Sequence, residues 1–363
     1  MKNTFLPLIF SSILWSCSDN KGESNLPPAM GLSGDVYVVM DSAQRKGPLG
    51  QAIDSMFSAD MEVINRTEPI FKVRWIDARK LNTALKQRRN VVFAVTLNQN
   101  SVGANRIKGM FNQESIDRIK SDTTFFLIAS KDQFAKNQEV MFLVGKTQEA
   151  LIKKINKNRT RIVEYFDKSE RERLSVSLFK AGQLKGTTDL MRQKFGVEIK
   201  IPFGYQLVQH DSTFLWVRQI NPKDDRDIFI ARKRYRSRDQ FQLDSLIQFR
   251  NDVCKKYLFG NPEKPQSFLV TEMAIPYKLV QAKQVTFENK YAVELRGLWR
   301  TNNITMGGPF LSYSLVDEAQ GMLYYIEGFT YAPGKPQREI MRELETILHT
   351  FKTSGEWKEK ENK

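Results

Sequence analysis

Cys17 is the residue whose surroundings most clearly indicate a chemical reaction. Lys2 gives the N-terminus a positive charge, an apolar run covers residues 5–10, and the small Ser16 directly precedes the cysteine. A basic start, an apolar stretch too short to cross a bilayer and a small residue at the cleavage point are typical of a signal peptide. We therefore expect residues 1–16 to be removed, which would leave Cys17 as the first residue.

Leu14-Trp15-Ser16-Cys17 resembles the bacterial lipobox, in which signal peptidase II cleaves before a lipid-modified cysteine. Trp15 stands where that motif usually has a small residue. The resemblance implies an acylated, palmitate-bearing Cys17, anchorage as an outer-membrane lipoprotein, and a body that faces the periplasm or the cell surface. The alternative is an ordinary signal peptide followed by a chance cysteine. Residues 17–31 are mostly polar and contain two prolines, so they are predicted to form a flexible tether.

Three arginines at alternate positions, Arg232, Arg234 and Arg236, are candidates for binding an anion. The period of two in a strand would place them on one side. Guanidinium groups bind phosphates and carboxylates through paired hydrogen bonds. The alternative is a solvated strand end whose arginines pair with the acidic residues of 224–227.

Met306, Gly307 and Gly308 begin a run that continues with Pro309 and Phe310. Paired glycines permit a positive φ or close backbone approach, and proline fixes the chain direction that follows. The run is therefore either a loop whose backbone amides meet a ligand or a tight turn between strands. Trp299 belongs either to an aromatic platform for a glycan or peptide or to the core.

Other patterns typical of catalysis or cofactor binding are missing from the sequence. The histidines, His210 and His349, lie far apart without neighbouring ligands at zinc spacing. Cys254 falls on an apolar helix stripe, which predicts an inert core thiol. There is no P-loop, no dinucleotide fingerprint and no Gly-x-Ser-x-Gly elbow. We therefore predict no catalytic residues, no metal and no cofactor.

The charge of the chain restricts its partners. Lys and Arg number 56 against 41 Asp and Glu, which gives a formal net charge of +15 over 363 residues. Such an excess favours anionic partners such as lipid headgroups or acidic glycans. Nucleic acid is not expected for an exported chain. The alternative is a solvated basic surface without a dedicated partner.

Residues 32–182 are predicted to form an α/β domain, because strand-like and helix-like segments alternate. Strands are expected at 35–40, 70–76, 91–96, 125–129 and 140–144, and helices at 48–57, 78–86 and 114–120. A long helix is expected to begin after Thr147. The capping-box pattern Ser169-Glu170-Arg171-Glu172 predicts a restart of the helix there, and Gly182 marks the domain boundary.

Residues 183–353 are predicted to form an α+β sandwich around a mostly antiparallel sheet, an order of elements similar to the PsbP-like fold. Strands are expected at 198–201, 205–210, 214–220, 227–235, 277–287, 291–300 and 323–331. A second capping box, Ser237 to Gln240, predicts a helix that ends near Leu258, and a last helix follows Pro336. Residues 354–363 are expected to be a frayed, charged tail.

Three segments together resemble a known family: Gly34 to Asp41, Glu68 to Phe71, and Gly297 to Arg300 leading to the run that starts at Met306. They are similar to Bacteroidetes lipoproteins grouped as domain of unknown function 4837. The similarity would cover nearly all of the mature chain. It implies a location and a fold size but no catalytic residues, because the family carries no assigned activity.

These features together predict a membrane-anchored envelope lipoprotein whose body is a non-enzymatic binding or assembly module. Its expected partners are the membrane, reached through the lipid, and an anionic envelope component or envelope protein. One alternative is a hydrolase or transferase that acts on an envelope polymer. It would use a pair of carboxylates, and the spacing of acidic residues along the sequence does not show which ones pair. A structural spacer is the other.

Overall fold

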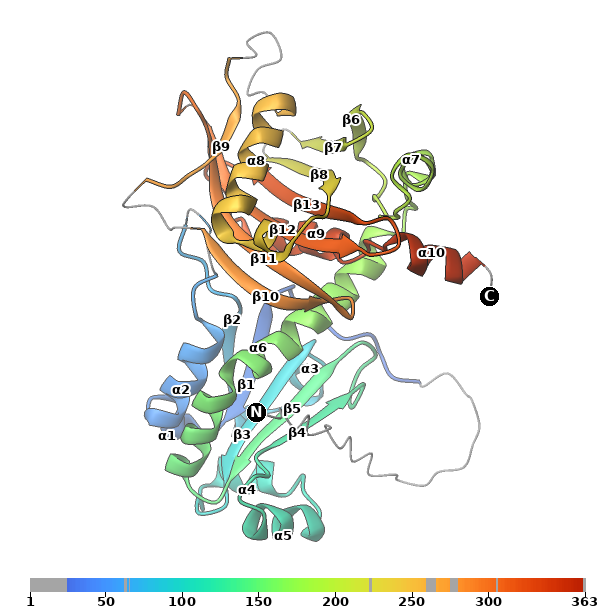
Figure 1. The fold of residues 1–363 in the computed structure, drawn as a ribbon. Coiled ribbons are helices and arrows are strands. Elements are labelled where there is room, and N and C mark those ends of the chain that lie inside the picture. The colour runs from blue at the N-terminus through green and yellow to red at the C-terminus, as the bar shows by residue number, and fades with distance from the viewer. Residues whose placement is uncertain are drawn as a thin grey trace.

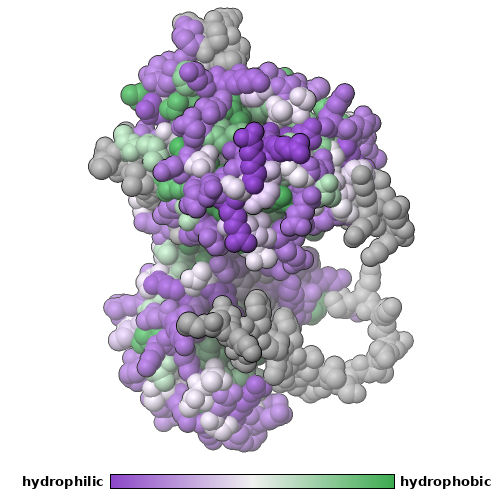
Figure 2. Space-filling view, in the orientation of Figure 1, coloured by the Kyte–Doolittle hydropathy of each residue, from purple (hydrophilic) through white to green (hydrophobic). Residues whose placement is uncertain are grey.

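The computed structural model describes residues 25–61, 64, 66–221, 224–258, 266–274, 280–304 and 306–361. The predicted leader, Cys17 and most of the tether lie outside the described residues. The chain forms two sheet domains, and the 31-residue helix α6 (Gln148–Leu178) runs from the first toward the second (Figure 1). The surface in Figure 2 is mainly hydrophilic and narrows to a waist between the two domains. None of the described helices combines the length and apolarity that a bilayer span requires.

The first domain is a five-stranded sheet in the order β2-β1-β3-β5-β4. The strands are parallel except β4, which pairs antiparallel with β5. Helices α2 and α6 cover one face and α4 and α5 the other, so the central strands are buried on both sides. The bounds are β1 (Asp35–Met40), α1 (Ser42–Arg45), α2 (Pro48–Phe57), β2 (Lys72–Asp77), η1 (Ala78–Lys80), α3 (Thr83–Lys86), β3 (Asn90–Thr96), α4 (Val102–Lys108), α5 (Gln113–Ser121), β4 (Leu127–Lys131) and β5 (Glu139–Gly145).

Helix α6 does not restart at Ser169, so that prediction was wrong. The Thr147 side chain caps the helix as expected, by accepting from Ala150 N. An N-cap serine needs a non-helical backbone and free amides to accept from. Ser169 instead lies within the continuous helix, where its hydroxyl is near Glu139 Oε1 at 3.0 Å and Tyr165 O at 3.2 Å. Ser169 and Glu170 are both buried.

The second domain is an antiparallel sheet in the order β10-β11-β12-β13-β8-β7-β6, with β9 paired to β11. Helix α8 packs on one face and α9 on the other. The predicted fold class, a mixed α/β domain followed by a mostly antiparallel α+β domain, is confirmed. The bounds are α7 (Lys185–Phe195), β6 (Gln206–His210), β7 (Phe214–Asn221), β8 (Asp224–Arg234), η2 (Arg238–Phe241), α8 (Leu243–Tyr257), β9 (Leu269–Thr271), β10 (Gln281–Phe287), β11 (Lys290–Thr301), β12 (Gly307–Asp317), β13 (Met322–Tyr331), α9 (Arg338–Leu348) and α10 (Ser354–Glu361).

Helices α8 and α9 of the second domain follow the apolar stripes seen in the sequence. The capping box from Ser237 to Gln240 is present, although it opens the short helix η2 and α8 begins two residues later. Cys254 on α8 is fully buried, and this burial raises the pKa of its thiol to about 12. Such a thiol stays protonated and is a poor nucleophile.

Strand β12 was missed because its glycines indicated a turn. Gly307 and Gly308 pair with Arg300 and Trp299 of β11, so they begin a strand. A Cβ at Gly308 would lie 2.0 Å from Thr330 O, which no side chain tolerates. Gly308 therefore allows the backbones of neighbouring strands to come close together within the sheet. The prediction of a loop at this position was wrong.

Two further segments have a local structure that differs from the prediction. Residues 198–201 form only an isolated bridge, between Glu198 and Lys352, and no strand. Residues 354–361 form α10, where a frayed tail was expected. The tail is fixed at its start because the Ser354 amide and hydroxyl both bind Asp317, at 2.8 and 3.0 Å.

Candidate functional site

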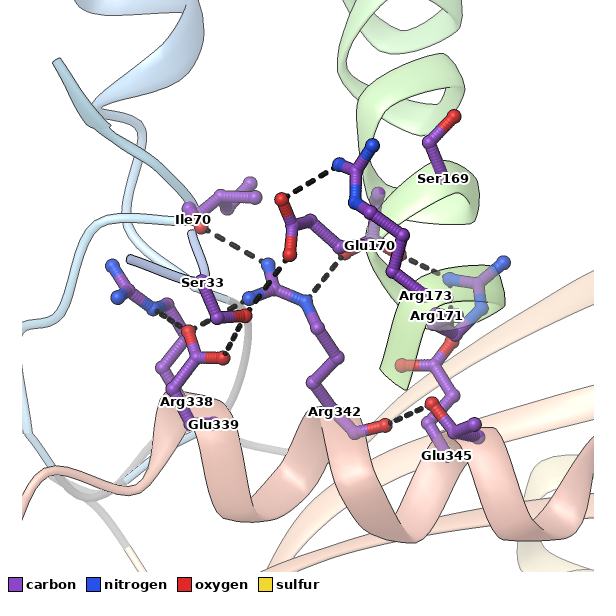
Figure 3. A network of polar contacts seen from close by, with 12 residues as sticks. Ser33, Ile70, Ser169, Glu170, Arg171, Arg173, Arg338, Glu339, Arg342 and Glu345 are labelled. Atoms are coloured by element: carbon purple, nitrogen blue, oxygen red, sulfur yellow. Dashed lines mark hydrogen bonds and ion pairs between the residues drawn. The ribbon is translucent and has the colours of Figure 1, made fainter. Parts of the chain in front are cut away.

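A buried network of charged side chains joins the two domains where α6 meets α9 (Figure 3). Glu170 of α6 is fully buried and accepts from Asn90 at 2.7 Å and from Arg173 at 2.8 Å. The Ser33 hydroxyl lies 3.0 Å from Glu170 and 2.7 Å from Glu339 of α9. These contacts satisfy a carboxylate that would otherwise be costly to bury.

Arg342 of α9 makes the second link and is 2% exposed. Its guanidinium bonds Asp167 of α6 at 3.1 Å and Glu339 at 2.8 Å. It also donates to Ile70 O at 3.3 Å and lies over the Phe71 ring. One arginine of the second domain thus contacts a helix and a loop of the first.

Glu345 forms a third group with residues of both domains. Its carboxylate lies 3.2 Å from Arg296 of β11 and 3.4 Å from Arg171 of α6, and Tyr313 donates to it at 3.2 Å. Burial alone would raise the pKa of Glu345, but the two arginines outweigh it and lower the pKa to about 2. The carboxylate is therefore charged at neutral pH and holds α6 against the second sheet.

This interface predicts the outcome of limited proteolysis. Lys180 is exposed in the short connection between α6 and α7, so trypsin is expected to cut there and give two fragments on a denaturing gel. The fragments should still elute together from a sizing column at neutral pH, because the buried ion pairs remain. Fragments that separate after a single cut would show that the interface does not hold the domains together.

A pocket of about 390 Å³ lies beside the network and is called the junction pocket here. The N-terminal segment forms one wall, where Ala29 N donates to Lys136 O at 2.9 Å. The β4–β5 connection and α6 form the others. Its lining residues are Pro28, Ala29, Arg89, Lys131, Asp132, Lys136 to Glu139, Ser169, Glu172, Arg173 and Val176.

The carboxylates that line the junction pocket are already occupied. Glu139 accepts from the hydroxyls of Tyr165 and Ser169. Lys131 lies between Glu139, at 3.5 Å, and Glu172, at 3.3 Å. Asp132 accepts from the backbone of Gln138 at 3.1 Å. These acids therefore offer little to a cationic ligand.

The cations that line the junction pocket retain donors. Arg173 uses its Nη atoms on Asn137 O, Asn90 and Glu170, while its buried Nε has no acceptor. Arg89 has one carboxylate contact, to Glu170 at 3.3 Å. Lys136 makes no ion pair with any described residue. This pocket can therefore bind an anion.

Arg232 has a different role from the one predicted. Its guanidinium donates to the carbonyls of Ser212, Lys194 and Phe195 at 2.9–3.0 Å, and it lies over the Phe195 ring. It therefore secures the end of α7. Arg234 ends β8 and is exposed, and Arg236 is exposed beyond the strand. The three arginines do not share one set of free donors.

The other predicted site residues lie together in β11 and β12 but within the core. Trp299 is 2% exposed, donates to Thr330 O at 3.2 Å and packs edge-on against Phe329. Met306 packs against the same core, and Gly308 is buried. The core interpretation of Trp299 therefore fits. Strand β13 lies between β12, which carries the glycines, and β8, which carries Arg232.

Several buried ionisable residues were missed. Arg250 of α8 and Glu327 of β13 form a bidentate ion pair with neither side chain exposed. Asp227 on β8 is 2% exposed, and burial raises its pKa to about 7 even though Arg218 and Trp216 oppose this. The only signal in the sequence was a charged residue at a helix or strand position that the apolar pattern assigns to the buried face.

Comparisons with known proteins assign each half of the chain separately. Residues 184–350 match the family model described as Domain of unknown function (DUF4837). This confirms an uncharacterised domain family. Residues 29–179 match a second model, Domain of unknown function (DUF8532), so the first family does not cover nearly all of the mature chain as expected. The segments matched by the two models meet where the boundary near Gly182 was predicted.

Solved structures show only distant likeness. The Ran-binding protein Mog1p of Saccharomyces cerevisiae is 9% identical with a TM-score of 0.29, over 44% of this chain and 90% of that one. A mutant of protein Mog1 gives 9% and 0.28, over 44% and 91%. LpqN of Mycobacterium tuberculosis, described as involved in cell envelope biogenesis, gives 14% and 0.26, over 43% and 81%. No curated protein matches the chain.

Proposed function

We propose that the protein is a Bacteroidetes envelope lipoprotein, anchored in the outer membrane through an acylated Cys17, whose two-domain body is a non-enzymatic binding or assembly module. The anchor is supported by the leader and the Leu14-Trp15-Ser16-Cys17 motif. The body faces the periplasm or the cell surface. Its partner is an anionic envelope component or an envelope protein.

The observation that carries the binding role is the junction pocket. There Arg89 has one carboxylate contact and Lys136 makes no ion pair with a described residue, while the carboxylates are occupied. The ion pair between Arg342 of α9 and Asp167 of α6 supports the role of a rigid body, because it ties the second domain to the helix that forms one wall of the pocket. Asp227 has a pKa suited to acid–base work, but its carboxyl is enclosed beside Trp216 and Arg218. That enclosure favours a structural role over catalysis.

Replacing the cysteine tests the anchor. The Cys17→Ala chain should take up no fatty-acid probe and should leave the membrane fraction, because the thiol that carries the lipid is gone. The measurement is metabolic labelling with an alkyne fatty acid, followed by fractionation of cells. The matched control is Cys254→Ala, which removes the buried thiol and should label as the native chain does. Undiminished labelling of Cys17→Ala would refute the lipid assignment.

A further inference from the structure

We propose that the junction pocket binds a phosphate ester, the group shared by glycerophospholipid headgroups and by free sugar or glycerol phosphates. This inference deepens the proposed function and rests on it, because the anchor at Cys17 is what would hold the pocket close to a membrane. The phosphate ester is the group that the pocket recognises, and the membrane beside the anchor is a source of it.

The free donors come from three separate parts of the chain. Arg173 lies on α6, Arg89 lies immediately before β3, and Lys136 lies in the β4–β5 connection. Arg173 Nε is buried without an acceptor, and an unsatisfied buried donor is destabilising. An anion in the pocket would neutralise Arg89 and Lys136, of which the first is only partly paired and the second makes no ion pair with a described residue.

The arrangement of the donors favours phosphate over carboxylate. A carboxylate is planar and suits one guanidinium fork, whereas the oxygens of a phosphate accept from several directions at once. Cationic side chains that line one pocket from a helix, a strand end and a loop suit the second geometry. The pocket volume of 390 Å³ leaves room for an organic group, which Pro28, Ala29 and Val176 can contact.

The position of the junction pocket indicates a source of phosphate. Pro28 lines the pocket and follows Cys17 by 11 residues. A fully extended chain advances at most about 3.6 Å per residue, so the pocket stays within roughly 40 Å of the anchor. If Cys17 carries the lipid, headgroup phosphates are the phosphate esters in greatest supply at that distance.

Vesicle binding by the unlipidated Cys17→Ala full chain tests the proposal without help from the anchor. The probes are vesicles of phosphatidylcholine with and without phosphatidylglycerol, and free glycerol 1-phosphate measured by calorimetry. We expect binding to glycerol 1-phosphate and to the phosphatidylglycerol vesicles, with glycerol 1-phosphate competing for the latter. Binding to glycerol 1-phosphate alone would keep the phosphate-ester site and assign a free ester as the ligand.

Two sets of substitutions separate the pocket from general surface charge. Arg89→Gln with Lys136→Gln should weaken binding at least about tenfold, since each removes a charged hydrogen bond. Lys153→Gln with Lys157→Gln makes the same charge change on the exposed face of α6 and should alter binding less than twofold. Equal losses in the two double variants would mean that charge alone is recognised.

A steric variant covers the case in which loss of Arg89 disturbs the fold. Val176 is 77% exposed at the pocket, so Val176→Trp should obstruct the site without removing charge. It should lose binding while keeping its circular dichroism spectrum and urea midpoint. The proposal is overturned if Val176→Trp binds as before, if acetate competes as well as glycerol 1-phosphate, or if neither probe binds. Fatty-acid labelling of the native chain is independent of these results, so a failed pocket and a failed anchor can be told apart.

Discussion

Glu327→Gln is expected to lower the free energy of unfolding by about 3–5 kcal/mol, because it leaves the guanidinium of Arg250 buried without its charged partner. Arg250 donates to both carboxylate oxygens of Glu327, at 2.8 and 2.7 Å, and to Thr271 at 3.1 Å. Burial alone would lower the pKa of Arg250, but Glu327 outweighs it and raises the pKa above its usual value. The variant removes that effect, but an arginine guanidinium is not deprotonated in proteins, so Arg250 stays charged. Urea unfolding at pH 7 measures the loss.

The matched double variant Arg250→Met with Glu327→Leu should recover most of the stability. Replacing a buried ion pair by apolar side chains of similar volume is often neutral or stabilising. Phe310, whose ring lies 4.0 Å from the guanidinium, and the surrounding apolar core would accept the methionine. A double variant as unstable as Glu327→Gln would show that the ion pair contributes net stability. Its hydrogen bonds to Thr271 and to Tyr325, whose hydroxyl donates to Glu327 at 2.6 Å, would then be part of that contribution.

Asp227→Asn is expected to make the protein more stable than the native chain at pH 8, to do so by a smaller margin at pH 5, and to change little below pH 4. Burial raises the pKa of Asp227 from 3.8 to about 7, against the opposing effects of Arg218 and Trp216. The folded state therefore favours the neutral carboxyl. Its contribution is complete below pH 4 and is lost as the pH rises through 7.

The size of this effect follows from linkage. A shift of one pKa unit corresponds to about 1.4 kcal/mol, so ionising Asp227 in the fold costs up to about 4 kcal/mol. Asparagine avoids that cost and can still accept from Trp216 Nε1, which lies 2.9 Å from the carboxylate. The measurement is the difference in unfolding free energy between native and Asp227→Asn at several pH values from 5 to 8.

A neighbour on the same sheet face supplies the control. Asp225 bonds Arg218 at 2.5 Å and is partly exposed, and it is the smallest of the causes that act on the pKa of Asp227. Asp225→Asn should therefore stabilise the protein much less than Asp227→Asn as the pH rises. Parallel pH profiles for native and Asp227→Asn would contradict the prediction. They would mean that Arg218, whose Nε lies 3.3 Å from Asp227, keeps that carboxylate charged throughout.

The main secondary structure could be predicted because apolar periodicity reports which side of an element is buried. The apolar runs at β1, β3 and β5 and the stripes of α2, α8 and α9 all correspond to observed core residues. Strand β12 was missed because a pair of glycines is typical of turns as well as of close backbone approach. The choice between them depended on Thr330, which lies on another strand.

The charged residues could not be placed in the same way. Glu170 and Arg342 carry charged side chains. The apolar periodicity of a helix predicts that charged positions face solvent. Glu170 is buried because Arg89 and Arg173 of its own domain neutralise it, and Arg342 is buried because it meets Asp167 of the other domain. Local sequence records neither burial. Ser169 was taken for an N-cap because the sequence does not show that its hydroxyl contacts Glu139 and Tyr165 within a continuous helix.

The sequence by itself determined the basic net charge, most of the order of the elements and the fold class, and it predicts the leader and the lipidated Cys17, because each depends on composition or on neighbours along the chain. Only the tertiary structure decided that Arg232 holds α7, that Trp299 lies in the core, and that Arg89, Lys136 and Arg173 line one pocket. These residues are far apart in sequence. Their chemistry depends on which partners the fold brings within hydrogen-bonding distance and on how much water it removes.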